Sequence, residues 1–192
     1  MRNTILIVFL IILLSIISFI MWAVGVNNKL VSLDESFNEK KAQVENVYQR
    51  RMDLVPNLVN TVKGYAKHEA NVFEEVTKAR SQVGQVKLDV SDMHKFEQAQ
   101  TQLSSALSRL LLVVEKYPDL KANQNFLELQ SQLEGTENRI TIERQRFNES
   151  AREYNTYIRK FPQSIVAGFR GFKEKIYFNA EPGANKAPKV EF

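Results

Sequence analysis

The first part of the chain is a long, uninterrupted run of apolar residues. From Ile5 to Val26 every residue is apolar or small except two serines, and no charged residue occurs between Asn3 and Asn28. Because an α-helix rises ~1.5 Å per residue, this run is long enough to cross the ~30 Å hydrocarbon layer of a bilayer. A secretory signal has a shorter apolar core of about 7–15 residues before a small-x-small cleavage site, which residues 21–26 do not offer. The pattern predicts an uncleaved signal-anchor over residues 1–28, with its membrane span from Ile5 to Val26.

After the span, apolar residues recur at three- and four-residue spacing, the pattern of amphipathic helices. Such stripes cover 29–51, resume after Pro56 over 58–83, and cover 93–117, with Ser91 as the predicted N-cap. A last helix from about Asn123 carries a seven-residue ladder, which is typical of helices packed lengthwise as in a coiled coil. The ladder consists of Phe126, Leu133, Ile140, Phe147, Tyr154 and Phe161.

No stretch of the body shows the sustained period-two alternation of a strand. The predicted fold class is therefore all-α: an N-terminal transmembrane helix followed by an up-and-down antiparallel bundle of long helices. The bundle domain is expected over 29–180, and the stretch 181–192, which contains Pro and Gly, is expected to be a mobile tail.

Pro56 determines how the first two stripes are connected. Proline removes the hydrogen bond to the carbonyl four residues earlier, that of Met52, so a helix must kink or end there. Residues 52–57 contain no Gly and have two apolar residues at their centre, which predicts one long kinked helix from about Lys29 to about Gln82. The alternative is a tight turn at Pro56 that gives a compact four-helix bundle.

The long helix would leave a membrane-proximal apolar stripe partly uncovered, because the next helix returns only about half its length. An uncovered apolar stripe favours self-association, so the long helix predicts a homo-oligomer. The stripe consists of Leu30, Leu33, Phe37, Val44 and Val47.

The charge of the chain lies mainly at its C-terminal end. The net charge is +4, but residues 29–158 carry 18 Lys or Arg against 19 Asp or Glu. A nucleic-acid-binding protein needs a basic face, which this neutral body does not provide, so no nucleic-acid partner is expected. The chain has no Cys, which excludes disulfides, cysteine zinc sites, thiolate catalysis and lipoprotein processing.

Motifs with a known chemistry are missing from the sequence. His68 and Glu69 begin an H-E-x-x-H pattern, but Val72 stands at its closing position. The Glu-x-x-His pair of di-iron bundles fails at both His68 and His94, because Tyr65 and Ser91 stand three residues earlier. No cofactor, no metal and no catalytic activity are therefore predicted.

Three groups of polar residues remain as candidate interaction sites or polar layers of the bundle. Glu69 lies seven residues from both Val62 and Val76, and such a carboxylate needs a partner or a raised pKa. Glu137 and Arg144 lie seven apart beside the ladder, where they would fix register or contact another protein. The third group surrounds the proline, as a recognition surface or a locally satisfied kink. The candidates are Arg50, Arg51, Asp53, Pro56, Asn57, His68, Glu69, Glu137 and Arg144.

The C-terminal block combines aromatic and basic residues. Its aromatic residues would lie on a membrane interface or pack on the end of the bundle, and the second arrangement is the one expected. The aromatic members are Phe169, Phe172, Tyr177 and Phe178, and the basic ones are Arg170, Lys173 and Lys175.

Long strings of the chain resemble the LemA family. They include QRRMDLVPNLVNTVKGYAKHE (49–69), EVTKAR (75–80), the block 117–162 that begins YPDLKANQNF, and GFKEKIYF (171–178). The resemblance implies a bacterial single-pass membrane protein with a helical up-and-down bundle. It also implies a connection with membrane protein quality control, including a heat-shock membrane zinc protease.

Together these patterns predict a membrane-anchored helical scaffold or adaptor that acts through protein–protein contacts with other membrane proteins. A lipid-facing, membrane-organising protein and an enzyme with a Glu/Arg site on its helices are the alternatives. Counting basic residues within 15–20 positions of the span favours a cytoplasmic domain, since Arg2 is opposed by Lys29, Lys40 and Lys41. The very short basic N-terminus, however, resembles an export signal, and we expect a domain outside the cytoplasm, anchored in the bacterial inner membrane.

Overall fold

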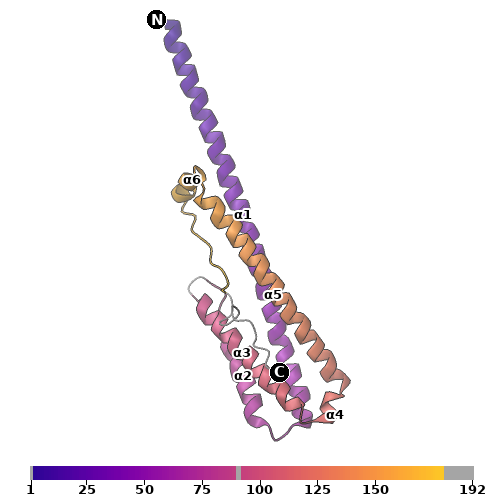
Figure 1. Cartoon of the computed structure of the whole chain (residues 1–192). Coiled ribbons are helices and arrows are strands. Elements are labelled where there is room, and N and C mark those ends of the chain that lie inside the picture. The colour runs from indigo at the N-terminus through magenta and orange to yellow at the C-terminus, as the bar shows by residue number, and fades with distance from the viewer. Residues whose placement is uncertain (1, 90–91, 180–192) are drawn as a thin grey trace, which may run out of the picture. The chain divides into compact units, whose positions relative to one another are not determined.

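The computed structural model describes residues 2–89 and 92–179, and within these ranges every regular element is a helix (Figure 1). The predicted all-α class is therefore confirmed. The predicted tail over 181–192 and the predicted N-cap Ser91 lie outside the described residues. The helices are α1 (Arg2–Tyr65), α2 (Ala70–Gly84), α3 (Met93–Val114), α4 (Pro118–Lys121), α5 (Gln124–Arg159) and α6 (Gln163–Arg170).

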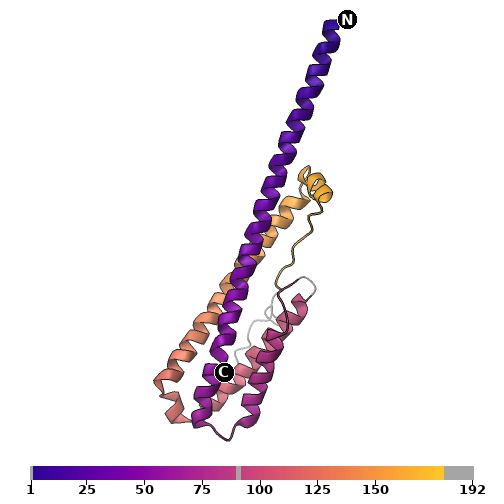
Figure 2. The same cartoon turned by 180° about the vertical axis from the view of Figure 1, so that it is seen from behind.

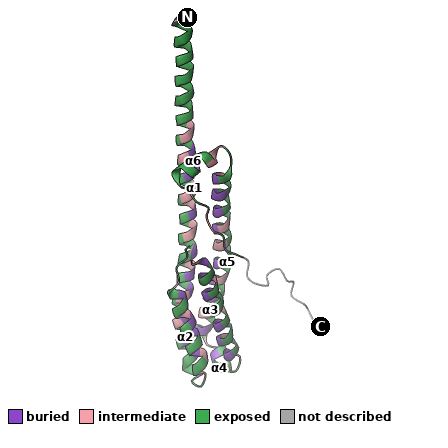
Figure 3. Cartoon of the chain, turned by 90° about the vertical axis from the view of Figure 1, so that its left-hand side faces the viewer, coloured by how far each residue is buried: buried purple, intermediate pink, exposed green. Residues whose placement is uncertain are grey.

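The N-terminal part of α1 is the apolar segment predicted to span a membrane. Its 18-residue window of highest mean hydropathy reaches 3.1, and none of that window is buried inside the chain. Figure 3 shows this part of the helix as exposed. A helix that is apolar on every side needs an apolar surrounding, and by length and composition α1 is able to cross a bilayer.

Helix α1 passes through Pro56 and ends at Tyr65, so neither predicted connection is correct. The chain reverses over residues 66–69, and α2 begins at Ala70 instead of continuing α1 to Gln82. The reversal buries Phe73 and Val76 in one cluster with Leu58 and Val62, whereas a continuous helix would leave these side chains in water.

Arg80 of α2 compensates for the hydrogen bond that Pro56 removes. Its Nε donates to the carbonyl oxygen of Met52 over 3.1 Å. Met52 lies four residues before Pro56, so its carbonyl is the one that loses its intrahelical donor. The partner of this carbonyl is thus a side chain of the next helix.

Contacts divide the chain into two compact units, to which α1 and α5 both contribute. We call residues 41–147 with 178–179 the core unit, and residues 2–40 with 148–177 the anchor unit. The predicted domain boundaries at residues 28 and 180 stay predictions.

The core unit is built around one large apolar cluster. Figures 1 and 2 show α2 and α3 side by side in this unit, and both helices bury one face in the cluster. It includes Val55 and Leu58 of α1, Leu103 and Leu110 of α3, and Leu120 of α4.

The anchor unit has a smaller apolar cluster. Its buried members are Val26, Leu30, Tyr154, Ile158, Val166 and Ala167, drawn from α1, α5 and α6. After α6, Asn155 holds the chain: its Oδ1 accepts from the backbone N–H of Lys175 over 2.7 Å, and its Nδ2 donates to the carbonyl of Lys175 over 2.8 Å.

The predicted ladder of α5 is buried at every step except the last. Phe126, Leu133, Ile140, Phe147 and Tyr154 are buried. Phe161 is 81% exposed, because α5 ends at Arg159 and the heptad spacing no longer places residue 161 on the packed side.

The membrane-proximal stripe, expected to be partly uncovered, is covered within the chain. Leu30, Phe37 and Val44 are buried, while Leu33 and Val47 are half-buried. The argument for self-association from an uncovered stripe is therefore wrong, and the homo-oligomer itself stays a prediction without that support.

Candidate functional site

Arg51 is the one buried residue among the candidates of the proline block. Its side chain is 3% exposed, and its Nε lies 2.8 Å from Oε1 of Glu137, which is 43% exposed. Its Nη2 donates to Oγ of Ser104 over 2.7 Å, and its Nη1 donates to Oε1 of Gln100 over 3.4 Å. The guanidinium therefore connects α1, α3 and α5.

The surroundings of Arg51 contain further buried polar groups. Burial raises the pKa of Tyr48, while the nearby guanidinium groups of Arg144 and Arg51 act in the opposite direction. Gln100 is buried, and its Nε2 has no hydrogen-bond partner within residues 2–89 and 92–179. Since Oε1 of this amide accepts from Arg51, the orientation of the amide is fixed by its environment.

Arg144, the second predicted arginine, holds the last described residues of the core unit. Its Nη2 donates to the carbonyl of Asn179 over 2.8 Å and lies 3.8 Å from Oε1 of Glu97. The guanidinium carbon lies 4.9 Å from the centroid of the Phe178 ring, and Glu97 also accepts from the backbone N–H of Asn179 over 2.9 Å. Arg144 and Glu137 thus make different contacts, and a role of either in contacting another protein stays a prediction.

The other polar residues of the proline block face outward on α1, and Pro56 is half-buried. Arg50, Asp53 and Asn57 are exposed, and Gln49 Nε2 donates to Oδ1 of Asp53 over 2.8 Å. They do not gather with Arg51, because on one helix neighbouring positions point in different directions.

His68 and Glu69 lie in the reversal between α1 and α2. His68 is exposed, and Glu69 is the N-cap residue of α2, although its side chain makes no capping hydrogen bond. Oε1 of Glu69 lies 4.0 Å from Nζ of Lys116. Glu69 is half-buried and does not share the buried face of Val62 and Val76, because the seven-residue spacing holds only within a continuous helix.

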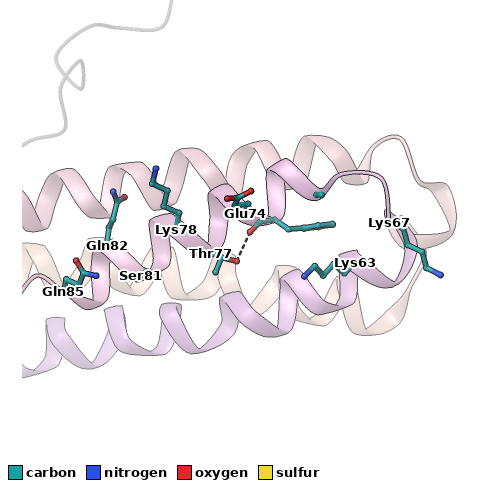
Figure 4. Close-up of a pocket in the computed structure, with 10 residues that line it drawn as sticks. Lys63, Lys67, Glu74, Thr77, Lys78, Ser81, Gln82 and Gln85 are labelled. Carbon is teal, nitrogen blue, oxygen red and sulfur yellow. Dashed lines mark hydrogen bonds between the residues drawn. The ribbon is translucent and has the colours of Figure 1, made fainter.

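The core unit also has a groove that was not predicted from the sequence (Figure 4). It has a volume of about 850 Å³ and lies at the C-terminal end of α1, the reversal and α2. Three lysines line it with a single carboxylate, that of Glu74. The lining residues are Lys63, Lys67, Ala70, Phe73, Glu74, Thr77, Lys78, Ser81, Gln82 and Gln85.

Among the described residues, the lysines of the groove have no acidic partners. Across residues 2–89 and 92–179 no carboxylate pairs with Lys63, Lys67 or Lys78, although Nζ of Lys63 lies 5.7 Å from the centroid of the Phe73 ring. Sequence patterns could not predict this groove, because Lys63 and Lys78 come together only when the chain reverses at 66–69.

A smaller cavity of about 310 Å³ lies beside Tyr48, Phe96 and Gln100 in the core unit. Neither hollow contains a metal-binding set: in the described parts of the chain, no three His, Asp or Glu residues are placed to hold an ion.

The fold and these surfaces define a class: a helical-bundle protein with an N-terminal helix long and apolar enough to cross a membrane. The family model of the LemA family matches residues 40–192. The chain therefore belongs to the LemA family, as its sequence strings indicated.

Curated relatives align with most of the chain. Magnetosome protein MamQ of Magnetospirillum gryphiswaldense is 27% identical, and magnetosome protein MamQ 2 of Paramagnetospirillum magneticum is 26% identical. Each alignment covers 90% of this chain and 71% of the relative. Protein LemA of Metamycoplasma hominis is 24% identical over 75% of this chain and 64% of its own length.

Proposed function

We propose that this protein is an adaptor anchored in the bacterial inner membrane, which acts by binding other proteins rather than by catalysis. Membership of the LemA family, the apolar N-terminal helix and the helical bundle support this function. The observation on which it mainly rests is the lysine-lined groove of the core unit, which has a volume of about 850 Å³.

The chemistry of the groove specifies what it would bind. Unpaired ammonium groups favour a partner with acidic side chains, and the wall formed by Phe73 and Ala70 adds an apolar contact. Ser81, Gln82 and Gln85 supply neutral hydrogen-bonding groups along the same wall. An acidic segment of another membrane protein meets these requirements.

The family resemblance extends the proposal to membrane protein quality control, with a membrane protease among the partners. The proposal also places the core unit outside the cytoplasm. If protease added to intact spheroplasts digests the core unit, that sidedness is supported. If the core unit becomes accessible only after lysis, the orientation is the reverse.

The proposal is tested by purifying the full-length chain from native membranes in a mild detergent and measuring the stoichiometry of any bound protein. The variant Lys63→Glu/Lys67→Glu/Lys78→Glu reverses the charge of the groove. A matched control, Lys40→Glu/Lys95→Glu/Lys116→Glu, makes the same change in charge at residues that do not line it.

We expect a stoichiometric partner with the natural chain and with the control, and loss of that partner with the groove variant. A photo-crosslinking residue at Gln82 should join to an acidic segment of the same partner. Equal recovery of the partner with both triple variants, or a crosslink to a segment without acidic residues, contradicts the proposal.

A further inference from the structure

Helix α6 lies against the part of α1 where the apolar run ends. Val166 and Ala167 belong to one buried cluster with Val26 and Leu30, and Trp22 packs on the same cluster. Arg170 Nε donates to Oδ1 of Asn27 over 3.1 Å. The contacts of α6 with α1 thus fall on residues 22–30, around the last apolar residue of the span.

The side of α6 that turns away from this cluster is strongly apolar. Ile165 is 57% exposed and Phe169 is 91% exposed, and their spacing of four places them on one face of the helix. Phe161, just before α6, is 81% exposed. Three large apolar side chains in water within nine residues are costly, and a patch of this kind marks a contact surface.

Basic residues flank this apolar face. Lys160 and Lys173 are exposed and lie before and after α6, and Arg170 is its last residue. Arg159 lies 3.7 Å from Glu174, so the one exposed carboxylate of this stretch already has a cationic neighbour. A face with aromatic and aliphatic residues between basic ones is typical of helices that lie in the headgroup layer of a membrane.

The position of α6 along α1, relative to the apolar run, indicates what contacts this exposed face. The 22 residues from Ile5 to Val26 extend roughly 33 Å as a helix, which matches the hydrocarbon thickness and brings residues 22–27 to its boundary. Because α6 packs on those same residues, its exposed face meets the interface of the bilayer that α1 crosses. A second protein on this face would have to displace lipid headgroups.

We propose that α6 is a second membrane contact, which inserts Phe161, Ile165 and Phe169 among anionic lipid headgroups beside the span. An isolated helix of eight residues is unstable in water, but α6 is held by its buried contacts and needs no membrane to form. This inference is independent of the adaptor proposal, because it uses no residue of the groove.

Tryptophan fluorescence of the full chain in vesicles tests the inference. The chain has one Trp, Trp22, so the background variant is Trp22→Phe, to which Phe169→Trp is added as the probe. The matched control places the probe at Leu112, which is 68% exposed on α3 of the core unit. The vesicles contain phosphatidylcholine brominated near the top of its acyl chains, with or without phosphatidylglycerol.

We expect the probe at position 169 to lose most of its emission to the brominated lipid, more so with phosphatidylglycerol, and the probe at position 112 to keep its emission. An unquenched, water-like spectrum at position 169 overturns the inference. An unquenched but blue-shifted spectrum also overturns it, since protein instead of lipid would then cover α6. Equal quenching with and without phosphatidylglycerol overturns the proposed preference of α6 for anionic lipid.

Discussion

The core unit and the anchor unit use apolar residues in different ways. In the core unit, α2, α3, α4 and parts of α1 and α5 surround one large cluster. Its exposed large apolar residues are scattered: Leu112 lies on α3, and Leu127 and Ile142 lie far apart on α5. The anchor unit has a six-residue buried cluster and leaves the apolar span and one face of α6 uncovered. Exposed apolar residues therefore indicate a contact surface in the anchor unit, where they are contiguous.

Ile140→Asp should have the largest effect on the core unit. Ile140 is buried on α5, and a carboxylate there would be desolvated without a partner, at a cost of roughly 3–5 kcal/mol. Thermal unfolding of the detergent-solubilised chain measures the loss. Arg139→Ala, at the exposed neighbouring position, should change stability by less than about 0.5 kcal/mol, and similar melting shifts for the two variants would refute the packing.

Arg51→Ala should cause the second largest loss of stability. It removes the hydrogen bonds that Arg51 donates to Gln100 and Ser104 and its ion pair with Glu137. We expect a cost of about 2–3 kcal/mol, limited because Glu137 retains access to water. Chemical denaturation measures the change. Arg50→Ala is the control, since Arg50 is exposed, and equal midpoints for the two variants would show that the buried guanidinium adds no net stability.

Asn155→Ala should affect the anchor unit selectively. It removes both hydrogen bonds between the Asn155 side chain and the backbone of Lys175, at a cost of about 1–3 kcal/mol. Hydrogen exchange should accelerate at the amide of Lys175 and remain slow in α3. Thr156→Ala, at an exposed position, should leave the exchange unchanged, and acceleration throughout the chain would argue against separate units.

A pH effect on the anchor unit should be the smallest of the four. Burial and the nearby Asp34 carboxylate raise the pKa of Tyr154 to about 12, although Lys175 lies 5.0 Å from its ring centroid. The neutral phenol is favoured in the folded state. Its contribution to the free energy of unfolding is therefore complete below the unfolded pKa of 10.0 and is lost as the pH rises towards 12. Melting temperatures across this range should fall more for the natural chain than for Tyr154→Phe, and parallel curves would exclude the effect.

The features predicted correctly from the sequence are those that repeat along one helix. The long apolar helix follows from its uninterrupted run of apolar residues. The five buried steps of the ladder follow from periodicity, which reports burial directly. The reversal at 66–69 was missed because it is stabilised by the packing of the apolar face of α1 against that of α2, which no local sequence pattern shows. The strong local signal in this region is Pro56, and it lies inside a helix that continues.

The candidate sites divide in the same way. The burial of Arg51 follows from its position among the apolar residues of α1, but its partners Gln100 and Glu137 come from helices far along the chain. The groove was invisible for the same reason, since Lys63 and Lys78 belong to different helices. Phe161 was misassigned to the buried ladder because α5 ends two residues before it.

The anchor unit is discontinuous in sequence, and this determines when it can form. The hydrogen bond between Arg170 and Asn27 spans 143 positions, and the whole of the segment 41–147 lies between the two parts of the unit. During synthesis the ribosome releases residues 22–37 long before 148–177, so the early part must wait while the core unit is made. Closing so long a loop is entropically less costly once the core unit is folded and brings the loop ends closer. We therefore expect the anchor unit to be the first part of this protein to be synthesised and the last to complete its folding.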